Sequence, residues 1–140
     1  MPARDVFHNA VRVALEKDGW AITNDPLFIE IENFPFHINP ETEGMLAAEK
    51  GDRKIALEIK SFPGTSKLDD FYEVLGQFIF YNSVLKDQPE NVTLYLAVSR
   101  DIYNDFLTKE FIQEIVKERG VKQLIVDRNE QNIGSWVNYC

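Results

Sequence analysis

The sequence has a single cysteine and lacks any long apolar run. Because that cysteine is the last residue, Cys140, an intramolecular disulfide and a thiolate metal cluster are both excluded. A membrane-spanning helix needs about 18 or more consecutive apolar residues, and no such run is present. Residues 1–5 do not resemble a charged-then-apolar leader. These absences predict a soluble protein in a reducing, cytoplasmic setting.

Basic residues are also scarce, with 15 Lys and Arg against 23 Asp and Glu and a net charge of −8. This balance argues against a protein that coats nucleic acid or an anionic membrane by bulk charge. The chain has 140 residues, of which 44% are hydrophobic and 12% aromatic. It is therefore long and apolar enough for one globular domain over residues 1–140.

Hydrophobic periodicity predicts an α/β protein with a mixed central sheet. Helices are expected at 5–18, 68–85, 102–106 and 110–119. Strands are expected at 28–32, 36–38, 44–50, 54–61, 91–99, 121–126 and 133–137, with a more extended stretch at 20–22. Strand 91–99 is almost fully apolar at its centre, which favours an interior position in a covered sheet.

The strands at 44–50 and 54–61 form the most informative pair. With Gly51 and Asp52 as a tight turn, Glu49 pairs with Lys54, and Met45 pairs with Glu58. Strand alternation then places Glu43, Glu49, Glu58 and Lys60 on the same face.

Two carboxylates and a lysine on one face are suited to metal-assisted hydrolysis of a phosphodiester. Mg²⁺ or Mn²⁺ is held by one or two carboxylates, and a lysine can orient water or stabilise charge on phosphorus. Glu58 and one further acid are the expected metal ligands. Glu43 is preferred, because Glu49 lies about four residues, roughly 13 Å, along the strand, and Glu49 is the rival. The alternative is an exposed face of weak Glu–Lys ion pairs.

The helix at 68–85 carries a second candidate group. Gln77 and Tyr81 are four residues apart and project from the same side. Gly76 lies beside them, although glycine inside a helix costs about 1 kcal/mol, so a packing or binding reason is expected.

Taken together, these residues resemble the PD-(D/E)xK nuclease superfamily, and Gln77 with Tyr81 resembles the Gln-x-x-x-Tyr motif of its RecB-like nucleases. More closely, the chain resembles the XisH family of cyanobacterial factors that control excision of the fdxN DNA element during heterocyst development. The matching stretches are RDVFHNAV (4–11), KDGW (17–20), LAAEKG (46–51), IALEIKSF (55–62), LGQF (75–78) with Tyr81, and LYLAV (94–98).

This resemblance implies a restriction-endonuclease-like core and a role in programmed DNA rearrangement. It implies a small XisI-type partner protein and a separate site-specific recombinase that carries out the exchange. Glu58 and Lys60 take the positions of the superfamily's Glu-x-Lys, with Gln77 and Tyr81 in the flanking helix. Where the family often has Asp-Leu-Gly-Ala-Glu, this chain has Asn39 at the first acid and keeps Glu43 at the last.

Two functions are consistent with this pattern. The chain is either a Mg²⁺- or Mn²⁺-dependent endonuclease, or a catalytically silent subunit that uses the same fold to bind DNA or its partner. A homo-oligomer is compatible with both. The charge of −8 predicts weak DNA binding by the chain alone.

Overall fold

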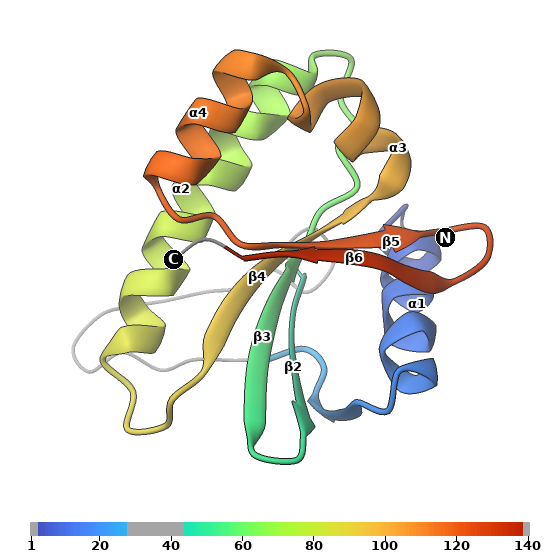
Figure 1. Cartoon of the computed structure of the whole chain (residues 1–140), viewed down its shortest axis with the longest axis vertical. Helices are drawn as coiled ribbons and strands as arrows, with labels where there is room; N and C mark the ends of the chain where they lie inside the picture. Colours follow the sequence, from blue (N-terminus) through green and yellow to red (C-terminus); the bar gives the residue numbers. More distant parts are fainter. Residues whose placement is uncertain (1–2, 28–43, 139–140) are drawn as a thin grey trace.

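A six-stranded mixed sheet forms the centre of the computed structural model, which describes residues 3–27 and 44–138 (Figure 1). Its strands follow the chain in the order β1 to β6. Pairs β3–β4 and β4–β5 are parallel, and the other three are antiparallel. The elements are α1 (Ala3–Lys17), β1 (Ala21–Asn24), β2 (Gly44–Lys50), β3 (Arg53–Ile59), α2 (Lys67–Lys86), β4 (Thr93–Ser99), α3 (Arg100–Ile102), a π-helix (Tyr103–Leu107), α4 (Glu110–Glu118), β5 (Gln123–Asp127) and β6 (Asn132–Val137).

The predicted mixed α/β sheet is confirmed, and its topology is compatible with a restriction-endonuclease-like core. Strand β4 lies between β3 and β5 and is buried over six of its seven residues, as its apolar sequence predicts. The strands expected at 28–32 and 36–38 lie outside the described residues.

Helices cover both faces of the sheet (Figure 1). α1 packs on one face, where the odd-numbered residues of β3 point: Ile55, Leu57 and Ile59. α2, the π-helix and α4 pack on the other face, against Ala56 and the even-numbered apolar residues of β4. Each strand of the centre therefore contributes to two separate apolar cores.

A π-helix replaces most of the α-helix predicted at 102–106. The amide of Thr108 donates to the carbonyl of Tyr103 at 3.0 Å, which closes an i→i+5 turn. Because the wider turn carries an extra residue, Phe106 and Leu107 both reach the core on the α2 side, although they are consecutive in the sequence. The packing of two adjacent apolar side chains accounts for the difference.

The two tryptophans of the chain pack together at the α1 side of the sheet. The ring centroids of Trp20 and Trp136 are 5.7 Å apart, and the Tyr95 ring stands edge-on to Trp136 at 5.0 Å. The β2–β3 turn joins this group, because the Arg53 guanidinium lies 5.2 Å and the Lys50 ammonium 6.0 Å from the Trp20 ring centre. This aromatic group links the first strand of the sheet to the last.

A buried ion cluster attaches α1 to the end of β1. Nε2 of His8 lies 2.7 and 2.8 Å from the two carboxylate oxygens of Asp25, and Arg12 donates to the same carboxylate at 2.5 Å. Burial acts to raise the pKa of Asp25, but the hydrogen bonds and positive charge of His8 and Arg12 outweigh it and hold that pKa below its usual value. These contacts support a structural role for His8, and no metal ligand set of three or more acidic, histidine or cysteine side chains occurs within 3–27 and 44–138.

Candidate nuclease-like site

The β2–β3 hairpin has the predicted register wherever both strands are described. Lys50 pairs with Arg53 across the two-residue turn, Glu49 pairs with Lys54, and Met45 pairs with Glu58. Gly51 adopts a positive φ of 60° in this turn, a conformation that suits glycine. The turn therefore fixes which side chains share a face.

Glu58 points to the α2 side of the sheet, as does Ala56 two residues earlier. Its cross-strand neighbours are Met45 on β2 and Leu96 on β4, both in the apolar core on that side. Only 1% of Glu58 is exposed. Burial of a carboxylate among apolar side chains is costly unless hydrogen bonds or a cation compensate for it. The sequence pattern predicted the face correctly, but it did not predict this depth.

Lys60 follows directly after β3 and is half-buried. Its amide donates to the carbonyl of Ala97 on β4 at 3.1 Å, so the hydrogen-bonded ladder continues one residue past the end of β3. Strand alternation, continued by this bond, directs Lys60 toward the side of Glu58. The two predicted residues thus occupy one face, at the carboxyl end of the same strand.

A short loop held by side chains fixes the chain after Lys60. Phe62 has a φ of 52°, a left-handed conformation that costs a non-glycine residue of order 1 kcal/mol, and its buried ring packs 6.2 Å from that of Phe106. The Lys67 ammonium donates to the carbonyls of Phe62 and Gly64 at 2.8 and 3.2 Å. A carboxylate oxygen of Asp70 accepts from the amide of Gly64 at 2.9 Å. Backbone strain stored next to Lys60 is typical of positions where geometry matters for function.

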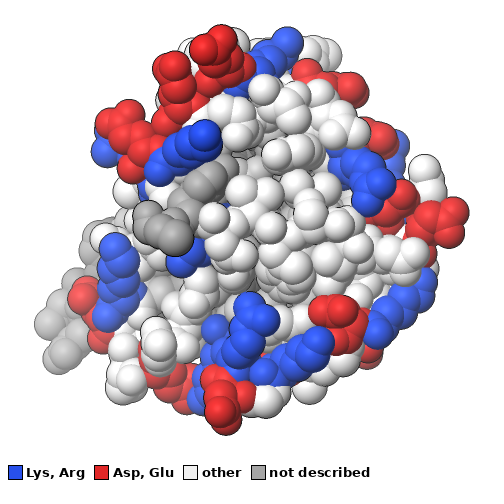
Figure 2. Space-filling model, viewed as in Figure 1, with Lys and Arg blue, Asp and Glu red and all other residues white. Residues whose placement is uncertain are grey.

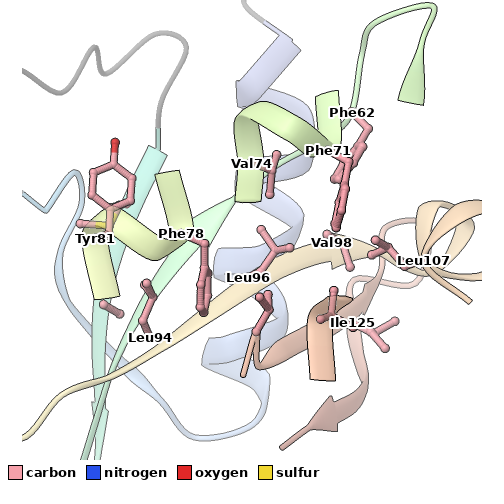
Figure 3. Close-up of a cluster of buried hydrophobic side chains, with 14 of the residues drawn as sticks. Phe62, Phe71, Val74, Phe78, Tyr81, Leu94, Leu96, Val98, Leu107 and Ile125 are labelled. Atoms are coloured by element: carbon pink, nitrogen blue, oxygen red, sulfur yellow. The ribbon is translucent and has the colours of Figure 1, made fainter. Parts of the chain in front are cut away.

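Gln77 and Tyr81 lie on α2, on the same side of the sheet as Glu58. Tyr81 is buried in the core between α2 and β4, and Gln77 is half-buried one turn earlier. Figure 3 shows Tyr81 at one end of the row of aromatic rings on α2, with its hydroxyl directed away from β4. The structure therefore brings four predicted residues, Glu58, Lys60, Gln77 and Tyr81, to one face of the sheet.

The two candidate second acids have different positions. Glu43, the preferred metal ligand, and Asn39 lie outside the described residues. Glu49 pairs with Lys54, which is four residues before Glu58 on β3. Glu49 lines a groove of about 500 Å³ between β1, β2 and the residues after α2. The register does not bring Glu49 to Glu58.

Gly76, by contrast, approaches no other part of the described chain. It lies on the exposed side of α2, and a Cβ atom built on it would meet nothing within 4 Å. The packing reason expected for this glycine is therefore not found within the part of the chain that the structure describes, and a binding reason stays a prediction.

Charged side chains of both signs alternate around the rim of the face shown in Figure 2, and its middle is largely uncharged. Basic side chains are most frequent along the lower edge of Figure 2. In the same view, Figure 1 shows the β2–β3 turn at the bottom of the molecule. Near the β2–β3 turn, the Lys50 ammonium lies 3.6 Å from the Asp18 carboxylate, and the Lys54 ammonium lies 3.3 Å from the Glu90 carboxylate. On this face acidic groups interrupt the basic ones.

Sequence reasoning missed the residues that hold the loop after β3. Pro63 and Gly64 are typical of a turn, but nothing in the order of residues shows that Phe62 is left-handed or that Lys67 donates to two carbonyls. Asp70 lies in the first turn of α2, where its negative charge suits the helix dipole, and it also accepts a hydrogen bond from the loop amide of Gly64. The presence of Lys67 and Asp70 just after a Pro-Gly turn was the available indication.

Comparison with known proteins identifies the family of the chain. The sequence matches the family model described as XisH protein over residues 1–134. The chain belongs to the XisH family. No curated protein matches it.

Two solved XisH-type structures share the fold over nearly the whole chain. One is an XisH family protein from Nostoc punctiforme PCC 73102, with 41% identity and a TM-score of 0.87. The other is an fdxN element excision controlling factor protein from Anabaena variabilis, with 40% identity and a TM-score of 0.87. In each case the alignment covers 96% of this chain and 100% of the other. The predicted XisH membership is confirmed. No helix of the described part of this XisH chain is long and apolar enough to cross a membrane.

Proposed function

We propose that this XisH protein controls excision of a DNA element and acts on DNA through a metal-dependent phosphodiesterase site at Glu58 and Lys60. The observation that carries this proposal is the position of Glu58. A strand whose role was only structural would hold an apolar residue there, yet a carboxylate is buried with a lysine two residues away. The name of the Anabaena variabilis relative, an fdxN element excision controlling factor, supports the excision role.

The donor atoms are of the kind that Mg²⁺ or Mn²⁺ requires. Mg²⁺ is commonly bound by one or two carboxylates and completes its shell with water and phosphate oxygens. Glu58 supplies one carboxylate from the described residues, and Glu43 would supply the second. A divalent ion bound there would polarise the phosphodiester and lower the pKa of a bound water.

The protein's own groups would position the substrate and stabilise charge. Lys60 would place an ammonium beside the phosphoryl oxygens, and the loop held by Lys67 fixes the backbone that carries it. Gln77 and Tyr81 would donate hydrogen bonds from α2 to the substrate or to the attacking water.

Partners are part of the proposal. With a net charge of −8 and mixed charges on the face in Figure 2, the chain would need help to hold DNA. An XisI-type partner would supply that surface, and a site-specific recombinase would carry out strand exchange.

Cleavage of supercoiled plasmid in Mn²⁺ tests the enzymatic proposal, with and without an XisI-type partner. Lys60→Ala is expected to lower the rate by at least about 100-fold. Lys54→Ala is the matched control, because Lys54 lies on the same strand and face but at the opposite end. Equal loss in both variants, or cleavage that survives in Lys60→Ala, would contradict this assignment.

A catalytically silent DNA- or partner-binding subunit is the second candidate, and one observation favours it. Glu58 is 1% exposed, whereas a metal that acts on DNA needs access to the phosphate. Binding of Mn²⁺ can be measured without any activity, by calorimetry on the intact protein. The proposed function predicts binding that Glu58→Gln abolishes and Glu49→Gln leaves intact. Absence of both metal binding and cleavage, with DNA association in the partner's presence, would establish the silent subunit.

A further inference from the structure

The outer face of α2 is unusually apolar. Six large hydrophobic side chains are markedly exposed among the described residues, and four of them lie on this helix: Leu68, Tyr72, Ile79 and Phe80. Tyr72 is 60% exposed and Ile79 is 46% exposed. Counted from Tyr72, Leu68 is four residues away, Ile79 seven and Phe80 eight, so the four follow one side of the helix, opposite the side that packs on the sheet. Figure 1 shows α2 along one side of the molecule, with the sheet on its inner side.

Gly76 lies in the middle of this apolar face, one turn after Tyr72 and one turn before Phe80. Because it has no side chain and no residue of the described ranges lies within 4 Å of where one would be, it leaves a shallow recess between larger side chains. A second helix can approach most closely at such a position, since interaxial distance depends on side-chain size at the point of contact.

The pattern around Gly76 is self-complementary for an antiparallel pair of helices. With a two-fold axis at Gly76, Tyr72 of each copy faces Phe80 of the other. Between Tyr72 and Phe80 the only charged residue is Glu73, which faces Ile79 of the other copy, so the centre of such a pair has no like charges in contact. At the two ends, the acidic first turn with Asp69 meets the basic last turn with Lys86.

We propose that the outer face of α2 is a self-association surface, on which a second copy of this chain packs antiparallel about Gly76. A contact between two like subunits by one shared patch is the commonest symmetry of soluble oligomers. The low charge at its centre, a single glutamate per copy, is important, because a protein with a net charge of −8 otherwise repels its own copies. This surface is separate from the proposed DNA site, which lies on the inner side of α2.

The association is expected to be reversible. α2 has 20 residues and is about 30 Å long, so one pair of helices is a small interface with a Kd of roughly 1–100 µM. Sedimentation analysis of the full chain over about 1–300 µM should then show its mass rise from 16.2 kDa toward about 32 kDa.

Ile79→Glu is the test variant, with at least a tenfold weaker association expected. Val6→Glu is the matched control, because Val6 is 68% exposed on α1, on the other face of the sheet, and should leave the mass unchanged. Circular dichroism confirms that both variants are folded. A chain that stays monomeric throughout, or a dimer that Ile79→Glu leaves intact, would overturn the proposal. A monomer that loses an XisI-type partner through Ile79→Glu would also overturn it, since the occupant would then be a different protein.

Cross-linking tests the position of the axis. In a Cys140→Ser background, Gly76→Cys is expected to form a disulfide-linked dimer readily, because the two copies of residue 76 meet at the axis. Ser83→Cys, two turns further along the same exposed side, is the control and should not link to itself. Preferential linking through position 83 would contradict the geometry.

Discussion

The two sides of strand β3 carry different kinds of side chain. The odd-numbered residues Ile55, Leu57 and Ile59 are all apolar and pack beneath α1. On the other side, the even-numbered residues include Glu58 in the core and Lys54 at the solvent-exposed end. One side of the strand thus stabilises the fold, and the other carries the groups that we propose to bind a metal and a phosphate.

The comparison also holds between the two ends of the hairpin. Each end carries a glutamate and a lysine, Glu49 with Lys54 and Glu58 with Lys60. Lys54 reaches water and the Glu90 carboxylate, so its charge is screened. Glu58 is enclosed, so a negative charge on its carboxylate interacts more strongly with neighbouring charges than a charge at the exposed end does. The two Glu–Lys pairs have the same residue types, and burial is what distinguishes the pair at Glu58 from the exposed pair at Lys54.

Leu57→Ala should have the largest effect on stability. Leu57 is fully buried beneath α1, so the cavity it leaves should lower the free energy of unfolding by about 2–5 kcal/mol. Urea unfolding measures this change. Metal binding per folded molecule should persist, and its loss would show that the two sides of β3 are not independent.

Asp25→Asn should lower the free energy of unfolding by about 2–3 kcal/mol near neutral pH, because His8 and Arg12 lose a buried carboxylate. The pKa of Asp25 is lowered in the folded protein, so the unfolded chain binds its proton more readily. The wild-type contribution should be complete above the unfolded pKa near 3.8 and disappear as the pH falls below it. Unfolding curves between pH 3 and 7 check this, and an unchanged acid dependence in the variant would contradict it.

Glu58→Gln should change the free energy of unfolding in chelator by less than about 2 kcal/mol, since size and shape are kept. Its main effect should be on ligand binding, with loss of the rise in Tm that Mn²⁺ produces in the wild type. A loss of stability as large as that of Leu57→Ala, with the metal response intact, would make Glu58 a structural residue.

Lys54→Ala should have the smallest effect, because its ion pair with Glu90 is exposed. The expected loss is about 0–1 kcal/mol, and it should shrink further in high salt. Thermal unfolding at low and high ionic strength measures it. A larger, salt-insensitive loss would mean that this end of β3 resembles the buried end.

The hairpin was predictable because its determinants are local. A two-residue turn and strict alternation are enough to assign Glu49 opposite Lys54 and Met45 opposite Glu58. The depth of Glu58 was not predictable, since it depends on how closely α2 packs over β3 and β4, elements that are distant in sequence. For the same reason, the contact between His8 and Asp25 could not be read from a helix pattern.

The paired tryptophans have a practical consequence for studying this protein. Trp20 and Trp136 are its only tryptophans, so nearly all of its intrinsic fluorescence arises from one place, where the beginning of the chain meets its end. Their emission will therefore report whether the N-terminal helix region and the last strand are joined. A ligand that binds between α2 and the sheet lies on the other face of the sheet, so it will leave the tryptophan emission unchanged. A fluorescent probe placed on α2 will be needed to detect such a ligand.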